Sequence, residues 1–109
     1  MKKIEAIIRS EKLQNVVDKL KSIGVQGMTI LEAVGWSKER VVELHFRGSR
    51  IDIDLLPKAK FEIVVTDDQA ERVVRAILEA AKTEEPGDGI IFIESIDEAI
   101  NIHFGQKVQ

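Results

Sequence analysis

Apolar and polar residues alternate along this chain with two different periods. From Lys2 to Arg9 the apolar side chains occupy every second position, which predicts a strand with one buried face. The apolar positions that follow recur at helical spacing, with Ser10 as the expected N-cap and Gly24 as the left-handed residue that ends the helix. The apolar stripe of this first helix consists of Leu13, Val16, Val17, Leu20 and Ile23.

The same succession returns later in the chain. Extended segments are predicted at 25–36 and 58–65, and Thr66 to Gln69 fits a capping box at the start of a second amphipathic helix. A fourth strand is predicted at 89–95 and a short tail strand at 99–104. The apolar stripe of the second helix consists of Ala70, Val73, Val74, Ile77 and Ala81.

The order of these elements predicts the fold class. Two successive β-α-β units are typical of an α+β, ferredoxin-like domain, in which an antiparallel sheet carries two helices on one face. The strands are also apolar on their other face, since Ile7 is followed by Ile8 and Ile90 by Ile91. A second apolar face must be covered as well, and this favours a closed oligomer in which the sheets of different subunits pack together.

The connection between the two halves, from about residue 37 to 55, is long for a compact domain. Both of its limbs alternate between apolar and polar residues, and Gly48-Ser49 suits a tight type II′ turn between them. Two interpretations stay open, a plain two-stranded extension of the sheet and a mobile arm that binds a partner. The alternating apolar residues are Val42, Leu44, Phe46, Ile51, Ile53 and Leu55.

Composition excludes several classes of function. The 109 residues are expected to form a single domain, and a net charge of −3 gives no basic field for nucleic acid. Without cysteine the chain has neither disulfides nor thiolate metal sites. We find no signal peptide and no apolar run long enough to span a membrane, so a soluble, cytoplasmic protein that is not inserted in a membrane is expected.

Catalytic and metal-binding residues are not apparent. His45 and His103 are the only histidines, and neither has a ligand-spaced partner, which argues against a metal site. No nucleophile stands beside a general base in any recognisable arrangement. We therefore expect no enzyme, and a small hydrolase that acts on ATP is the least favoured alternative.

The stretch TEEPGDGIIF, from Thr83 to Phe92, is better suited to a ligand than to a core. Gly87 and Gly89 flank Asp88 just before a predicted strand, so backbone N–H groups could turn inward around an anion. A loop that binds phosphate usually supplies a cation next, but here Ile90 follows. The sequence predicts an anion site with one of its expected charges missing.

Motifs along the whole chain resemble the PII signal-transduction proteins, the nitrogen regulatory family. They lie in the family's order and spacing and require no insertion, so residues 1–109 resemble a single PII-like domain. The resemblance places the family's T-loop at about 37–55 and its phosphate loop at about 83–90. The motifs are MKKIEAII at the start, GMT at 27–29, RG at 47–48, DxLPKxKxEIVVxDDQ at 54–69 followed by ERVV, and TxxxGDGxIF at 83–92.

The resemblance implies a homotrimer with ATP or ADP in each cleft between subunits, and AMP is a further candidate. It places the adenine near Thr29, Glu62 and Val64, and the phosphates on Gly87, Asp88 and Gly89. These assignments are chemically reasonable, because Thr29 and the backbone beside Val64 can hydrogen-bond to an adenine edge. The glycines allow phosphate oxygens to approach the backbone closely.

Departures from the family pattern predict either weak nucleotide binding or a preference for nucleotides with fewer phosphates. The family usually has a lysine where this chain has Ile90, and two arginines where it has Asn101 and His103. Each lost charge-assisted hydrogen bond is worth about 1.5–3 kcal/mol, or roughly tenfold to a hundredfold in affinity. The residues available to compensate are Lys58, Lys38, Arg40 and, when protonated, His103.

The long loop departs from the family at the positions that receive regulatory signals. Glu39 stands where relatives that sense 2-oxoglutarate have a glutamine, and Ile51 stands where some have a tyrosine that is uridylylated. We therefore expect a regulator that controls a transporter or an enzyme without either signal. The alternative is an interaction trimer that has lost nucleotide control. The candidate partner-binding residues are Lys38, Glu39, Arg40, Phe46, Arg47, Ser49, which is phosphorylated in some relatives, and Ile51.

Overall fold

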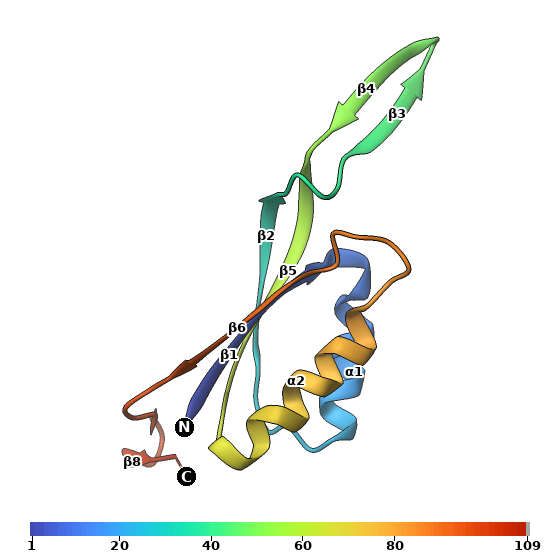
Figure 1. Ribbon diagram of the computed structural model, residues 1–109. Helices are drawn as coiled ribbons and strands as arrows, with labels where there is room; N and C mark the ends of the chain where they lie inside the picture. Colours follow the sequence, from blue (N-terminus) through green and yellow to red (C-terminus); the bar gives the residue numbers. More distant parts are fainter. Residues whose placement is uncertain (109) are drawn as a thin grey trace.

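The computed structural model describes residues 1–108 and has the ferredoxin-like architecture predicted from the sequence (Figure 1). Its central sheet contains four antiparallel strands in the order β2-β5-β1-β6. The two strands of each β-α-β unit are therefore not neighbours, which is the split arrangement. The strands are β1 (Lys2–Arg9), β2 (Thr29–Trp36), β5 (Leu55–Val65) and β6 (Gly89–Ser95).

Both helices, α1 (Leu13–Ser22) and α2 (Asp67–Ala81), lie on the same side of this sheet (Figure 1). Their apolar stripes pack on the alternate residues of the strands that the period of two had assigned to the buried face. Burial of each large side chain stabilises the fold by about 1.5–3 kcal/mol. The largest fully buried side chains are those of Phe61, Ile4, Leu20, Ile63, Ile77 and Val16.

The C-terminus of α1 follows the sequence prediction. Gly24 has a φ of +86°, and the N–H of Val25 donates to the carbonyl of Leu20 at 3.1 Å. This is the pattern of a Schellman motif, in which the left-handed residue lets the chain turn back and satisfy the last carbonyls of the helix.

The predicted helix starts need correction. Ser10 is not the N-cap of α1, because it opens a short 3₁₀ turn, η1 (Ser10–Lys12), and the α-helix begins after that turn. Thr66 is the N-cap of α2, but the N–H of Gln69 donates to the backbone carbonyl of Thr66, at 3.0 Å, and not to its side chain. The sequence located both helices, whereas the side-chain capping was wrong.

The long connection folds into a hairpin of β3 (Val42–Phe46) and β4 (Ser49–Ile53), which projects away from the sheet and helices (Figure 1). Both limbs are strands, as predicted. The predicted Gly48-Ser49 turn was wrong, because Arg47 and Gly48 are the two central residues and both have positive φ, 51° and 77°. Left-handed conformation at both positions is typical of a type I′ turn.

The two faces of the hairpin differ in chemistry. Val42 lies opposite Ile53 and Leu44 opposite Ile51, so one face is apolar. The other face is charged, and on it Arg50 reaches Glu43 at 2.8 Å and Asp52 at 2.9 Å. This ion-pair bridge offsets the repulsion between the two carboxylates, which lie directly across the ladder from each other.

The tail after β6 forms a small structure of its own. The predicted strand at 99–104 was too long, since β7 (Ile100–Asn101) is followed by a turn and pairs with β8 (Gln106–Lys107). The side chain of Asn101 accepts a hydrogen bond from the N–H of Phe104 at 3.1 Å. His103 lies in this turn, beyond the end of β6 that is near the N-terminus of the chain (Figure 1).

The sheet face opposite the helices, called the open face below, combines ion pairs with exposed apolar side chains. Lys60 lies 3.1 Å from Glu5 and 3.5 Å from Glu62, and Lys3 lies 3.8 Å from Glu62. Alternation along the strands puts Leu31, Val64, Ile90 and Phe92 on this same face, each 40–53% exposed.

Within residues 1–108, no helix has the length and apolar character needed to cross a membrane.

Candidate functional site

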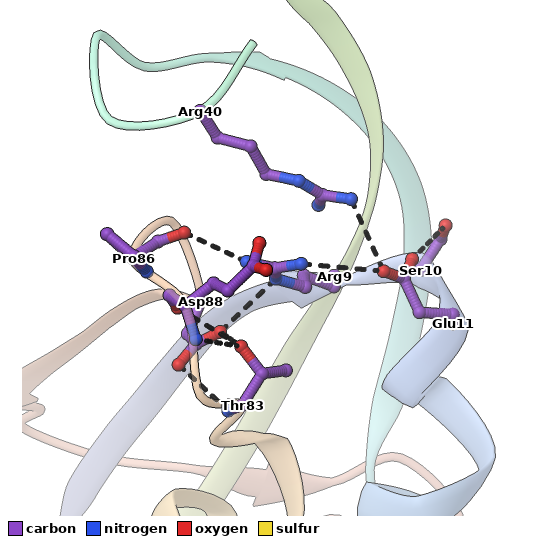
Figure 2. Close-up of polar contacts among 8 residues, drawn as sticks. Arg9, Ser10, Glu11, Arg40, Thr83, Pro86 and Asp88 are labelled. Carbon is purple, nitrogen blue, oxygen red and sulfur yellow. Dashed lines mark hydrogen bonds and ion pairs between the residues drawn. The ribbon is translucent and has the colours of Figure 1, made fainter. Parts of the chain in front are cut away.

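The 83–90 loop between α2 and β6 is closed by Asp88. One oxygen of this carboxylate accepts a hydrogen bond from the Thr83 hydroxyl at 2.5 Å, and the other accepts one from the Thr83 backbone N–H at 2.9 Å (Figure 2). These bonds, with a contribution from Arg9, lower the pKa of Asp88 below its usual value. Asp88 therefore faces the inside of its own loop as a carboxylate, and its first role is to shape that loop.

Arg9 joins this loop to the end of β1. Its guanidinium donates from Nη2 to the carbonyl oxygen of Pro86 at 2.9 Å, and its Nε lies 3.2 Å from Asp88 Oδ1 (Figure 2). Only 7% of Arg9 is exposed. Arg9 was not predicted as a site residue, because a single arginine at the end of a predicted strand gives no sign of what lies beside it.

Lys58 and Arg40 bring two further positive charges to the same place. Lys58 is buried and lies opposite Arg9 in the β1–β5 register. Its aliphatic stem packs on Gly35 of β2, where a Cβ would lie 3.1 Å from Lys58 Cγ. Burial lowers the pKa of Lys58, and the nearby charges of Arg40 and Arg9 lower it further. The sequence had proposed Lys58 and Arg40 for this role, and the fold brings them together.

Two carboxylates belong to this cluster of three cations. Glu11 lies 3.5 Å from Arg40 and 3.9 Å from Arg9, and Asp88 pairs with Arg9. The pKa of Glu11 is lowered, first by a hydrogen bond from its own backbone and then by the positive charges of Arg40 and Arg9. Three positive and two negative charges leave one cation unmatched, which favours the binding of an anion.

The two glycines of the loop have steric reasons to be glycine. Both have positive φ, +89° at Gly87 and +125° at Gly89. A Cβ on Gly89 would lie 1.9 Å from the carbonyl oxygen of Ile7 on β1, and one on Gly87 would lie 2.7 Å from Arg40 Cβ. The fold alone therefore explains both glycines, and their presence is weaker support for a phosphate site than the sequence implied.

The residues predicted to hold the adenine lie further along the open face. Thr29 is the cross-strand partner of Glu62, and Val64 is two residues beyond Glu62 on β5. Glu62 is four residues from Lys58, or about 13 Å at the rise of a strand. The residues predicted to hold the adenine and the cations beside the predicted phosphate loop therefore form a track along β5. This track runs from Val64 at one end to the cation cluster at the other.

The remaining candidates lie elsewhere. His103 is at the end of the sheet opposite the 83–90 loop, so it does not reach that loop within one chain (Figure 1). Ile90 is 53% exposed on the open face. In the long connection, Lys38 and Glu39 are exposed at the base of the hairpin, and the other exposed candidates follow its strands and tip: Phe46, Arg47, Ser49 and Ile51.

Two cavities are lined by none of the three cations, although the first reaches Asp88 and Gly89 of the 83–90 loop. One, of about 500 Å³, lies between α2 and the edge strand β6 and is lined mainly by apolar side chains, among them Leu78 and Ile93. The other, of about 210 Å³, lies where α1 ends and α2 begins and includes Gly27 and Val64. Among residues 1–108, no three His, Cys, Asp or Glu side chains are grouped as metal ligands.

Comparisons with known proteins agree along the whole chain. A sequence model of the family described as nitrogen regulatory protein P-II matches residues 1–106. The nitrogen regulatory protein P-II of Bradyrhizobium diazoefficiens is 46% identical over 107 residues, which cover 98% of this chain and 96% of the relative. That of Rhodospirillum rubrum is 45% identical with the same coverage. Nitrogen regulatory protein P-II 2 of Methanothermobacter thermautotrophicus is 44% identical over 98% of this chain and 93% of the relative.

Proposed function

The chain belongs to the nitrogen regulatory protein P-II family, and on that basis we propose that it binds an adenine nucleotide between the subunits of a homotrimer. The family consists of regulatory proteins and not of enzymes. The nucleotide is ATP or ADP, with AMP as a further candidate, and its binding is weak. The bound state is communicated to a partner, a transporter or an enzyme, through the β3–β4 hairpin.

The observation that carries this proposal is the cation cluster beside the 83–90 loop. Arg9, Arg40 and Lys58 converge there from three segments that are far apart in the sequence, and their charge exceeds that of the two nearby carboxylates. The same open face carries Thr29 and Glu62 further along β5, where polar side chains can hydrogen-bond to a base. A ligand with an anionic end and a planar polar end fits this track.

A trimer is supported by what one chain leaves uncovered. The strands at the two edges of the sheet, β2 and β6, each have one side without a partner strand among the described residues. The open face carries half-exposed Phe92 and Ile90, and its charged residues already pair with one another. His103 lies at the other end of the sheet from the 83–90 loop, so it can contribute to such a site only from another subunit.

The hairpin supports a role in partner binding that does not depend on 2-oxoglutarate. It is a preformed two-stranded unit with one apolar face, and Leu44, Phe46 and Ile51 on that face are 46–63% exposed. Glu39 at its base would repel a dicarboxylate. We therefore expect docking to depend on the hairpin and to be insensitive to this metabolite.

Calorimetric titration with ATP, ADP and AMP, with Mg²⁺ and with or without 2-oxoglutarate, tests the proposal. We expect saturable binding of ATP and ADP and no change on addition of 2-oxoglutarate. Lys58→Gln should weaken binding by roughly tenfold, since one charge-assisted bond is lost. Lys21→Gln, which removes an exposed lysine in the last turn of α1, is the control and should have less effect.

The second candidate function is an interaction trimer without nucleotide control. It is favoured by one observation: the guanidinium groups of Arg9 and Arg40 already form ion pairs with Glu11 and Asp88. A titration without saturation up to millimolar concentrations of every adenine nucleotide would replace the first proposal by this one.

A further inference from the structure

Glu11 places a negative charge inside the proposed anion site. Its Oε1 atom lies 3.5 Å from Arg40 Nη2 and 3.9 Å from Arg9 Nη1, so one carboxylate oxygen faces two of the three cations (Figure 2). Asp88 is needed to close its loop through Thr83, but Glu11 comes from η1 and makes no hydrogen bond to the 83–90 loop among those that the described residues form. Its carboxylate takes the place that an external anion would take.

Arg40 is held where such an anion would meet it. The N–H of Arg40 donates to the carbonyl of Ser37 at 3.4 Å, which turns the chain just before the hairpin. Arg40 Cβ packs so closely on Gly87 that a methyl group there would lie 2.7 Å away. The guanidinium therefore belongs both to the base of the hairpin and to the rim of the 83–90 loop, and Glu11 is its ion-pair partner.

We propose that Glu11 is a specificity-determining residue that lowers affinity for a third phosphate and thereby shifts the site toward nucleoside diphosphates. This inference rests on the proposed function, because it concerns the ligand of the same site. The direction of the track gives the reason. With the base near Thr29 and Glu62, each further phosphate lies nearer the Lys58 end of β5, where Arg9, Arg40 and Glu11 are.

Charge balance at that end favours two phosphates over three. A third phosphate adds negative charge close to Glu11 and must displace its carboxylate from Arg40 and Arg9 before using them. The position after Gly89 offers Ile90 and no further cation. The Glu11 contacts are long and the Glu11 side chain is 55% exposed, so displacement is weakly opposed and changes selectivity without closing the site.

The test is the ratio of the dissociation constants for ADP and ATP in Glu11→Gln, measured by calorimetry with Mg²⁺ at low ionic strength. Removing the carboxylate should tighten ATP binding more than ADP binding, so that the ratio changes by about threefold to tenfold in favour of ATP. Glu11→Ala should give the same change, because the charge and not the amide is decisive. Glu71→Gln is the matched control, since it removes a carboxylate paired with Arg75 at 2.8 Å on α2, outside the site.

The outcomes separate the two proposals. If both nucleotides bind the unchanged protein and the ratio is the same in Glu11→Gln and in Glu71→Gln, the role of Glu11 is wrong and the proposed function stands. An equal gain for ATP and ADP in Glu11→Gln would also overturn it, because a general change in charge would then explain the effect. If neither nucleotide binds any of the proteins, the proposed function fails and this inference fails with it.

Discussion

The Nε atom of Arg9, at the end of β1, lies 3.2 Å from Oδ1 of Asp88, in the loop just before β6. Arg9 is almost completely buried, and its other principal contact is the carbonyl of Pro86 in the same loop. The contact therefore fixes the shape of the 83–90 loop. It also consumes part of the positive charge that a phosphate would use.

Asp88→Asn tests how much this contact contributes to stability. The substitution removes the nearer of the two carboxylates beside the buried guanidinium of Arg9, leaving Glu11 at 3.9 Å, and weakens the bonds from Thr83. We therefore expect the free energy of unfolding to fall by about 1–3 kcal/mol. Urea titration followed by circular dichroism measures it. Asp97→Asn, an exposed carboxylate for which residues 1–108 provide no ion pair, is the control and should change stability by less than about 0.5 kcal/mol. Equal stability of the two variants would mean that the contact is unimportant for the fold.

Stability should depend on pH in the acidic range. The pKa values of Asp88 and Glu11 are lower in the folded protein than in the unfolded chain. Between the folded and unfolded values the unfolded chain binds more protons, so the free energy of unfolding rises with pH there and is fully developed above about pH 5. It is lost as the pH falls below about 4 toward the folded pKa values.

The same titration in Asp88→Asn assigns part of this dependence. The slope of unfolding free energy against pH should be smaller than in the unchanged protein but not zero, because the N-terminal amine also lowers the pKa of Asp67. Parallel curves for the two proteins below pH 4 would show that Asp88 titrates alike in the folded and unfolded states.

Two substitutions in the turn of the hairpin should change the rate of amide hydrogen exchange in opposite directions. Arg47 and Gly48 both have positive φ, a conformation that asparagine followed by glycine adopts more readily. Arg47→Asn should therefore slow amide hydrogen exchange across residues 42–53. Gly48→Val should speed it, because a β-branched residue is strained at positive φ. If both variants exchange at the rate of the unchanged protein, the type I′ turn does not control hairpin stability.

A charge on the open face should disrupt the proposed trimer. Phe92 is 49% exposed on β6, and Phe92→Glu would place a carboxylate beside Glu5, its cross-strand partner. We expect the sedimentation coefficient to fall from that of a trimer to that of a monomer at micromolar concentration. Asn15→Glu adds the same charge on the exposed side of α1 and should leave the trimer intact. Persistence of the trimer in Phe92→Glu would locate the interface on another face.

The turn of the hairpin shows where local sequence was insufficient. A Gly48-Ser49 turn would have put Arg47 opposite Arg50, two like charges beside the loop. The observed register instead puts His45 opposite Arg50 and lets Arg50 bridge Glu43 and Asp52. Both registers pair apolar residues on one face, so periodicity alone could not choose between them, and the charges across the ladder distinguish them.

The sequence by itself determined the two main helices, the four strands of the central sheet, their order and hence the fold class. The period of two in Lys2 to Arg9 and the helical period after it depend on side chains a few residues apart, which is information that a local stretch contains. The same holds for the left-handed residue at Gly24 and for the two limbs of the hairpin. The family motifs added the positions of Lys58 and of Gly87-Asp88-Gly89.

Only the tertiary structure decided which charges meet. Arg9, Arg40 and Glu11 belong to three separate segments, and they converge because β1 pairs with β5 and because the base of the hairpin packs on Gly87. It also showed that Gly89 must be glycine for the close approach of β6 to Ile7, whether or not a phosphate binds. Convergence of this kind depends on strand order and register, which are set by contacts between distant parts of the chain and leave no periodic signal in the sequence.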